Sequence, residues 1–323
     1  MRMILSGLCG LFLILSACGD SAKSLAEVSV VPLYDEIYQY NTLDSIRQRE
    51  FIERDSIALK AFMTVVSGEP FDAGLVESWA ASRAVEVFTP IVDSVYRRES
   101  PLQESLGNIL ATAKSEQILL PHRRYAEIVY GRPESILFVD SVMLVALNHY
   151  LGADFEGYSH LPSYMRLVKT PEMLPFDVAE ALVATSYPYQ HSNESTVLSR
   201  LLYEGALAYA RRELVGKPDI STALGYTPEQ YAWLEDNEKG LWNALVSKGL
   251  VFDTSGRLAS RLVDPSPSTS DLIAGAPGRA GRYIGYKLVC SYLKRHKGTP
   301  LSRLLSPDFY ANPAILSEIS YNP

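Results

Sequence analysis

Residues Asp44 to Val66 read DSIRQREFIERDSIALKAFMTVV, and this stretch is the clearest guide to the fold class. Its apolar side chains recur largely at the three- and four-residue spacing of an α-helix, with charged residues on the other side. These apolar residues are Ile46, Phe51, Ile52, Leu59, Phe62, Met63 and Val66. Gly68-Glu69-Pro70 ends the pattern. The spacing predicts an amphipathic helix with one face on a core.

The same helical period recurs along most of the remaining chain. Amphipathic patterns predict helices over residues 73–97, 101–117, 174–185, 195–214 and 280–296. A further helix is predicted to begin at Thr227-Pro228-Glu229-Gln230, where Thr suits the N-cap, Pro the first helical position and Gln the reciprocal capping position. We therefore expect a mostly helical protein that ends in a proline-rich, irregular C-terminus.

One segment in the middle of the chain has a different pattern. Tyr125–Tyr130 is an apolar, partly β-branched run, and Ile136–Val139 and Val142–Val145 follow beyond a Gly131-Arg132-Pro133 turn. Runs of this kind on either side of a turn predict a hairpin or a small sheet. The expected fold class is therefore mainly α (α+β): a single helical domain over residues 32–323 with a small β-hairpin or sheet.

The composition of the 323-residue chain limits the classes of function that it can have. Hydrophobic residues make up 47% and charged residues 21%, which provides enough apolar surface for a core and too little charge for disorder. Asp and Glu (37) outnumber Lys and Arg (30), for a formal net charge of −7. Because general nucleic-acid binders usually carry a basic surplus, we expect no nucleic-acid partner.

The N-terminus has the pattern of a secreted lipoprotein. Residues 1–17 read MRMILSGLCGLFLILSA, with a cation followed by an apolar run of about 13 residues, too short to span a bilayer. Small residues then precede Cys18, as in a bacterial lipobox, where the cysteine is acylated and the leader removed before it. The alternative is an ordinary signal peptide with a cysteine at its cleavage point by chance.

A lipidated Cys18 would set the location of the protein. Two or three acyl chains anchor a protein stably where one chain does not. Residues 18–31 are then the lipidated cysteine and a short, small and polar tether to the folded body. We expect a protein of the cell envelope that is attached to the inner or outer membrane through its N-terminal lipid, and the sequence leaves the membrane and leaflet open.

The common catalytic signatures are absent from the sequence. None of the five histidines belongs to a His-Glu-x-x-His motif, and no Cys-x-x-Cys pair or glycine-rich phosphate loop occurs. The Gly157-Tyr-Ser159-His160-Leu161 stretch begins like a nucleophile elbow, but Leu161 replaces its second glycine. We therefore expect no enzyme: no catalytic residue, no metal and no cofactor.

Four stretches, in this order behind a lipobox, carry a family resemblance. They are Asn148–Tyr158, Leu202–Tyr209, Gly225–Glu238 and Pro277–Tyr286. Together they resemble the gliding-motility lipoprotein GldB family of the Bacteroidetes, most clearly from about Leu137 to Arg295. The resemblance implies a lipid-anchored envelope protein associated with the gliding and protein-secretion apparatus. It also implies envelope protein partners and no established enzymatic activity.

Three glycines, Gly278, Gly281 and Gly285, lie three and four residues apart, on one side of the last long predicted helix or its entry turn. A glycine inside a helix costs about 1 kcal/mol relative to alanine. We expect close approach of another backbone to offset this cost, and ligand binding is the alternative. Arg279 and Arg282 are interpreted as solvated charges, although a helix start also suits an anion.

Glu204, followed by Gly205 and Tyr209 on a predicted helix, resembles the second metal-ligand helix of gluzincin peptidases. The first-helix motif is missing, since Phe176–Ala181 reads FDVAEA where His-Glu-x-x-His would stand. A zinc site without those two imidazoles falls short of its usual three protein ligands. Two interpretations remain: a degenerate zincin-like fold reused as a binding or structural module, or a helix Glu bonded to a neighbouring Tyr or Arg.

Two alternative functions remain open from the sequence. His149, His160 and His191 could converge with Glu204 on a metal, which would make a metal-dependent hydrolase with a non-standard ligand set. Histidines near turns are more often hydrogen-bonded structural groups. The tyrosine-rich turns suit contact surfaces with a polar tip, either for a protein interface or for stacking in a cell-wall glycan-binding lipoprotein. Tyr209 belongs to these interface candidates.

Overall fold

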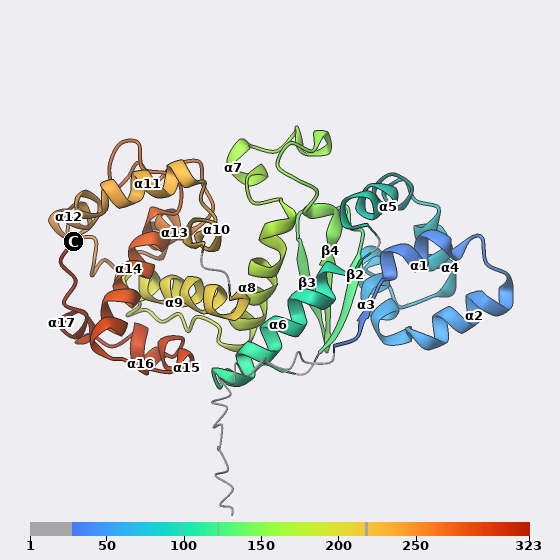
Figure 1. Ribbon diagram of the computed structural model, residues 1–323, viewed down its shortest axis with the longest axis horizontal. Helices are drawn as coiled ribbons and strands as arrows, with labels where there is room; N and C mark the ends of the chain where they lie inside the picture. The colour runs from blue at the N-terminus through green and yellow to red at the C-terminus, as the bar shows by residue number, and fades with distance from the viewer. Residues whose placement is uncertain (1–27, 98, 122, 217–218) are drawn as a thin grey trace, which may run out of the picture.

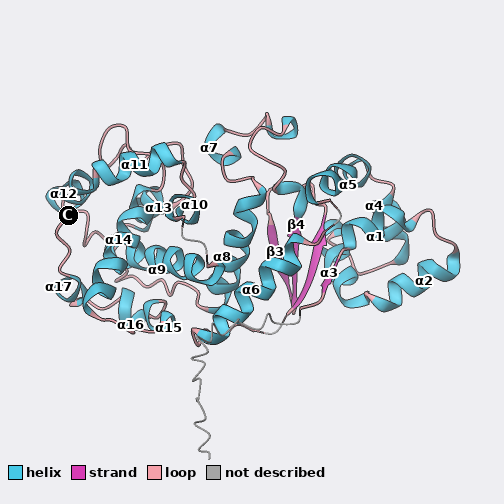
Figure 2. Ribbon diagram, in the orientation of Figure 1, coloured by secondary structure: helices cyan, strands magenta, loops and turns pink. Residues whose placement is uncertain are grey.

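The computed structural model describes residues 28–97, 99–121, 123–216 and 219–323. The predicted leader, the predicted lipidation of Cys18 and most of the predicted tether lie outside these described residues. Helices form most of the described chain and surround a small sheet (Figure 2), which confirms the mainly α, α+β fold class. Among the described residues, no helix combines the length and the apolar character that crossing a membrane requires.

The sheet has four strands in the order β1-β2-β4-β3, with bounds β1 Val30–Val31, β2 Arg124–Ile128, β3 Ile136–Val139 and β4 Val142–Ala146. The β1–β2 and β2–β4 pairs are parallel, and only β3–β4 is antiparallel. The small sheet is therefore confirmed, but a hairpin about the Gly131-Arg132-Pro133 turn is wrong. The hairpin turn is Asp140-Ser141 instead, because β2 pairs with β4 and not with β3. Val30 and Val31, assigned above to the tether, are a strand of this sheet.

Both faces of the sheet are buried, so helices lie on each side of it. Ala126, Ile128 and Leu144 pack into one apolar cluster with the N-terminal helices. Tyr125 and Met143 point to the opposite face and join a larger cluster. The N-terminal helices are α1 Leu33–Tyr40, α2 Ser45–Arg54, α3 Ser56–Ser67, α4 Ala73–Ala80 and α5 Arg83–Tyr96.

Two predicted long helices are each broken in the structure. The 44–66 pattern forms α2 and α3, which meet at Asp55. The 73–97 pattern forms α4 and α5, because the Ser82 hydroxyl caps a new helix by accepting from the Val85 N–H. The helical spacing of apolar residues continues across such a break, because the apolar faces of both helices still point to one core. The boundaries therefore depend on local capping that hydrophobic spacing does not report.

The larger half of the molecule is built around α9, Val197–Val215, which is buried on nearly all sides (Figure 1). Helices α6 Pro101–Ser115, α8 Leu174–Ser186 and α14 Ala280–Arg295 pack against it. The predicted capping box at the start of α11 is present, with reciprocal bonds between Thr227 and Gln230. The remaining helices are short: α7 Ser163–Arg166, α10 Ile220–Leu224, α11 Pro228–Asp236, α12 Glu238–Ser247, α13 Gly256–Val263, and the 3-10 turns Leu147–His149, Glu156–Tyr158 and Pro171–Met173.

The C-terminus differs from the irregular segment that its prolines predict. It forms α15 Leu301–Leu304, α16 Pro307–Tyr310 and α17 Ile315–Ile319. Pro307 stands at the first position of α16, where a helix tolerates proline. Phe309 and Tyr310 are buried, so this segment packs on the core.

Helices α9 and α14 approach each other at glycines. A Cβ added to Gly205 would overlap the backbone of Gly285, and a Cβ added to Gly285 would overlap the Leu201 carbonyl. On Gly281 an added Cβ would lie 2.7 Å from the Leu262 carbonyl oxygen, and on Gly278 it would overlap the Ser266 carbonyl. The expectation of close backbone approach is therefore confirmed at Gly278, which precedes α14, and at Gly281 and Gly285 within it. Gly205 on α9 is the partner that the sequence pattern did not identify.

Replacement of Gly205 by Ala is expected to force α9 and α14 apart, because the methyl group has no free space. Overpacking of this kind costs about 1–3 kcal/mol of unfolding free energy. Gly240→Ala on α12 is the matched control, since its Cβ would meet only the Ile273 Cδ1 at 3.7 Å. That control should be neutral or stabilising by up to about 1 kcal/mol. Denaturant unfolding measures both, and equal stabilities would contradict the packing argument.

A buried carboxylate, Glu127 on β2, makes the stability of this fold depend on pH. Its side chain is 1% exposed and accepts hydrogen bonds from the Ser100 hydroxyl (2.7 Å) and the Leu102 N–H (3.2 Å) at the start of α6. Burial raises the pKa of Glu127 to about 7, although these two hydrogen bonds oppose the rise. Because the folded state holds this proton more tightly than the unfolded chain does, its contribution is complete below about pH 4.5 and is lost as the pH rises through about 7.

Replacement of Glu127 by Gln should remove this dependence while keeping both hydrogen bonds at the amide oxygen. Between about pH 4.5 and 7 the wild type should lose up to about 3 kcal/mol of stability relative to the variant. Urea unfolding at pH 5 and pH 8 measures the difference. The exposed Glu134→Gln control should follow the wild type. Parallel pH profiles for wild type and Glu127→Gln would show that the prediction is wrong.

Candidate functional site

The most unusual chemistry of the described chain is a group of charged side chains where α8, α9 and α14 meet. We call Asp177, Glu180, Glu204, Arg211 and Arg282 the ionic cluster. The first two residues lie on α8, the next two on α9 and the last on α14. Side chains with a full charge are rarely buried unless they are paired, so the pairing within this cluster determines what it can do.

Arg282 is the centre of the ionic cluster. It is 1% exposed, and its guanidinium donates to both carboxylate oxygens of Glu180, with 2.8 Å from Nη1 to Oε1. The same Nη1 lies 3.6 Å from Oε2 of Glu204. The interpretation of Arg282 as a solvated charge is therefore wrong. The close approach of α9 and α14 at their glycines places this side chain inside the core, where two carboxylates offset the cost of its burial.

Glu204 is paired on both sides. Its Oε1 lies 2.9 Å from Nη2 of Arg200, one turn earlier on α9, and its Oε2 faces Arg282. The residue is 7% exposed, and burial raises the pKa of this carboxyl although both arginines oppose the rise. Of the two interpretations of Glu204, the geometry matches a helix Glu bonded to neighbouring arginines.

Arg211 connects the cluster to α8. Its Nη1 lies 2.5 Å from Oε2 of Glu180 and its Nη2 lies 3.4 Å from Oδ1 of Asp177. The Tyr150 hydroxyl donates to the other oxygen of Asp177 at 3.1 Å. Burial raises the pKa of Asp177, whereas for Glu180 the nearby Arg282 and Arg211 outweigh the effect of burial and hold the pKa well below its usual range. Glu180 therefore stays ionised between two guanidinium groups.

A small cavity of about 230 Å³ lies beside the ionic cluster and has a mixed lining. Arg279 and Lys169 supply its positive charge, and Tyr226 and Ser135 supply hydroxyl groups. Arg279 precedes α14 with a positive φ of 64°, its Nε donates to the Val263 carbonyl at 3.2 Å, and its own carbonyl accepts from the Tyr226 hydroxyl at 2.8 Å. Arg279 is thus fixed by backbone contacts at the edge of a cavity.

The three candidate histidines do not converge with Glu204. His149 accepts at Nδ1 from Ser135 (3.0 Å), since its Nε2 faces the Tyr130 carbonyl (3.2 Å) and must carry the proton. Burial, with the charge of Lys169, lowers the pKa of His149 to about 4. His191 lies beside the Tyr189 ring, and His160 is exposed. Within the described part of the chain, no group of three or more His, Cys, Asp or Glu residues has the geometry to hold a metal ion.

Tyr209 lies outside the ionic cluster. Its ring is 6.2 Å from the ring of Tyr286 on α14. Asp177, Glu180 and Arg211 were not predicted as members of the cluster. A signal was present, because two carboxylates three residues apart interrupt the apolar FDVAEALV stretch of a predicted helix. Their cations lie 31 to 102 residues away along the chain, and one sequence does not report such pairing.

Replacement of Arg282 by Met should strongly destabilise the protein, because Glu180 and Glu204 would be left facing each other without the central cation. Breaking a buried ion pair in this way costs about 3–5 kcal/mol. The matched control is Arg261→Met, which breaks the exposed pair with Asp271 (2.8 Å) and should cost less than about 1 kcal/mol. Denaturant unfolding compares the two variants. Similar losses would show that the cluster does not hold the helices together.

Comparison with known proteins identifies the family of this chain. A family model described as gliding motility protein GldB matches residues 20–323, which is nearly the whole chain. No curated protein and no solved structure matches it. The matched range includes the sheet, the ionic cluster and the C-terminal helices. The chain therefore belongs to the gliding motility protein GldB family.

Proposed function

We propose that this protein is a lipid-anchored, non-catalytic component of the cell envelope that supports the gliding-motility and protein-secretion machinery. Its membership of a gliding motility family supports the role in motility. The lipobox ending at Cys18 supports the anchor. The protein acts in this proposal as a rigid body held at a membrane, and its partners are other envelope proteins.

The pairing of Glu204 is the observation that supports the non-catalytic role. A general base or a metal ligand needs a carboxylate oxygen that is free to meet a proton or a cation. Here Arg200 and Arg282 each pair with one carboxylate oxygen of Glu204. Arg211 and Arg282 likewise pair with the carboxylate oxygens of Glu180. Guanidinium groups occupy the space between the carboxylates, and an arginine stays charged at every physiological pH. The cluster is suited to holding three helices in register.

The experiment is complementation of a deletion strain in a gliding host, with colony spreading and secretion as readouts. Wild type should restore both. Glu204→Gln should also restore both when its abundance matches wild type, because the amide keeps the packing and one acceptor. Cys18→Ser should fail, because the body is no longer held at the membrane. Mass spectrometry of the wild-type N-terminus should show acyl chains on Cys18.

Two results would contradict the proposal. A folded, abundant Glu204→Gln protein that behaves like the deletion would indicate a catalytic carboxylate. Normal spreading and secretion in the deletion strain itself would remove the link to the machinery.

A further inference from the structure

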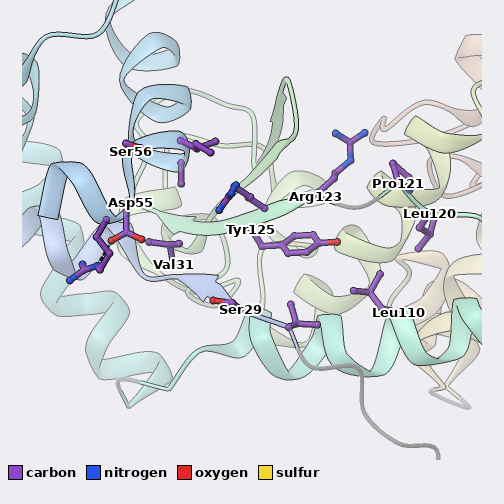
Figure 3. A pocket seen from close by; sticks show the side chains of 14 residues that line it. Ser29, Val31, Asp55, Ser56, Leu110, Leu120, Pro121, Arg123 and Tyr125 are labelled. Atoms are coloured by element: carbon purple, nitrogen blue, oxygen red, sulfur yellow. Dashed lines mark hydrogen bonds and ion pairs between the residues drawn. The ribbon is translucent and has the colours of Figure 1, made fainter. Parts of the chain in front are cut away.

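A cavity of about 590 Å³, which the proposed function does not use, lies at the end of the sheet where β2 begins. Figure 3 shows Ser29, just before β1, and Val31 of β1 on its walls, together with Asp55 and Ser56 at the start of α3. Arg123 and Tyr125 lie on the side of β2. The cavity therefore lies between the N-terminal helices and the sheet edge.

The charge of this cavity is positive. Arg54, Arg123 and Arg124 line it against one carboxylate, Asp55, which Arg54 already neutralises through a 2.5 Å contact from Nε to Oδ2. Arg123 donates to the Asp140 carbonyl at 3.2 Å and lies over the Phe138 ring. No described carboxylate lies within ion-pair distance of Arg123 or Arg124. Two cations therefore remain for an anionic ligand.

The position of the cavity relates it to the membrane. Val28, the first described residue, lines the cavity and follows Cys18 by ten positions. A chain of ten residues reaches about 35 Å when fully extended and about 18 Å on average when flexible. An anchored protein consequently keeps this face close to the bilayer surface, where anionic headgroups are concentrated.

The rim of the cavity carries an exposed apolar side chain. Leu120 and Pro121 line the cavity, and Leu119 directly before them is 81% exposed. The Leu119 N–H donates to the Tyr187 hydroxyl, so its backbone is held while its side chain faces outward. Apolar tips beside cationic residues are typical of surfaces that lie at a membrane interface.

We propose that this cavity binds the phosphate headgroup of an anionic phospholipid in the membrane that carries the anchor. Arg123 and Arg124 pair with the phosphate, Ser29 and Ser56 lie within the same cavity as hydroxyl donors, and Leu119 contacts the acyl region. This inference rests on the proposed lipid anchor. It adds a second, headgroup-specific contact that orients the body on the bilayer, since a single point of attachment limits distance but does not fix orientation.

The test is calorimetric titration of the full chain in neutral detergent with soluble short-chain lipids. The probes are dihexanoyl phosphatidylglycerol, dihexanoyl phosphatidylcholine and inorganic phosphate. Phosphatidylglycerol should bind, and the other two should bind at least about tenfold more weakly. Arg123→Gln/Arg124→Gln should weaken phosphatidylglycerol binding roughly 10- to 30-fold, since each cation near anionic lipid contributes about one factor of five. Lys239→Gln/Arg257→Gln, which removes the same charge from exposed sites on α12 and α13, should bind like wild type.

Several results would overturn the inference. Equal binding of both lipids would remove headgroup selectivity, and equal binding of inorganic phosphate would assign the cavity to the free anion. Binding unchanged in Arg123→Gln/Arg124→Gln, or lost equally in the control, would place the effect elsewhere. Arg124→Gln alone serves if the double variant unfolds at a lower temperature, because Arg124 is exposed. The titration does not require acyl chains on Cys18. Its outcome therefore tests the cavity even if mass spectrometry finds Cys18 unmodified.

Discussion

The structure depends on one buried guanidinium, that of Arg282, held between carboxylates from two other helices. An ion of this size costs several kcal/mol to remove from water, and only paired charges in good geometry offset that cost. The geometry needs α9 and α14 close together, which their glycines allow. It also needs α8 beside them, so that Glu180 meets both Arg282 and Arg211. The close packing of α9 against α14 and the charge pairing of Arg282 therefore depend on each other.

The same pairing gives every carboxylate oxygen of Glu180 and Glu204 an arginine partner, whereas the metal-ligand Glu of the peptidase helix that Glu204 resembles needs an oxygen free for the metal. Asp177 and Glu180 lie on α8 and Glu204 lies on α9, so three acidic groups belong to one cluster. In this chain their counter-ions are arginines supplied by α9 and α14. A guanidinium makes fixed, planar hydrogen bonds and does not exchange with solvent ions, so it gives rigidity and no open coordination position.

Several features that depend on local sequence were predicted correctly, although the helix breaks at Asp55 and Ser82 and the C-terminal helices were not. Helical spacing, the Thr227–Gln230 capping box and the crowding at Gly285 each arise from residues a few positions apart, or from a cost that only close packing offsets. Features that depend on distant partners were not predicted. The sheet order requires knowing that β2 pairs in parallel with β4, and the burial of Arg282 requires Glu180, 102 residues away. From sequence alone, a charged side chain is predicted to be solvated, because its distant partner is not known.

We infer that Glu180 and Arg282 stabilise the fold through each other, and a double-mutant cycle tests this coupling most directly. The cycle compares the unfolding free energies of wild type, Glu180→Gln, Arg282→Met and the combined variant. The account predicts a coupling free energy of about 2 kcal/mol or more, since residues in one buried ionic network are not additive. Additive losses, with a coupling near zero, would contradict it and would mean that the three helices are held together without this ion pair.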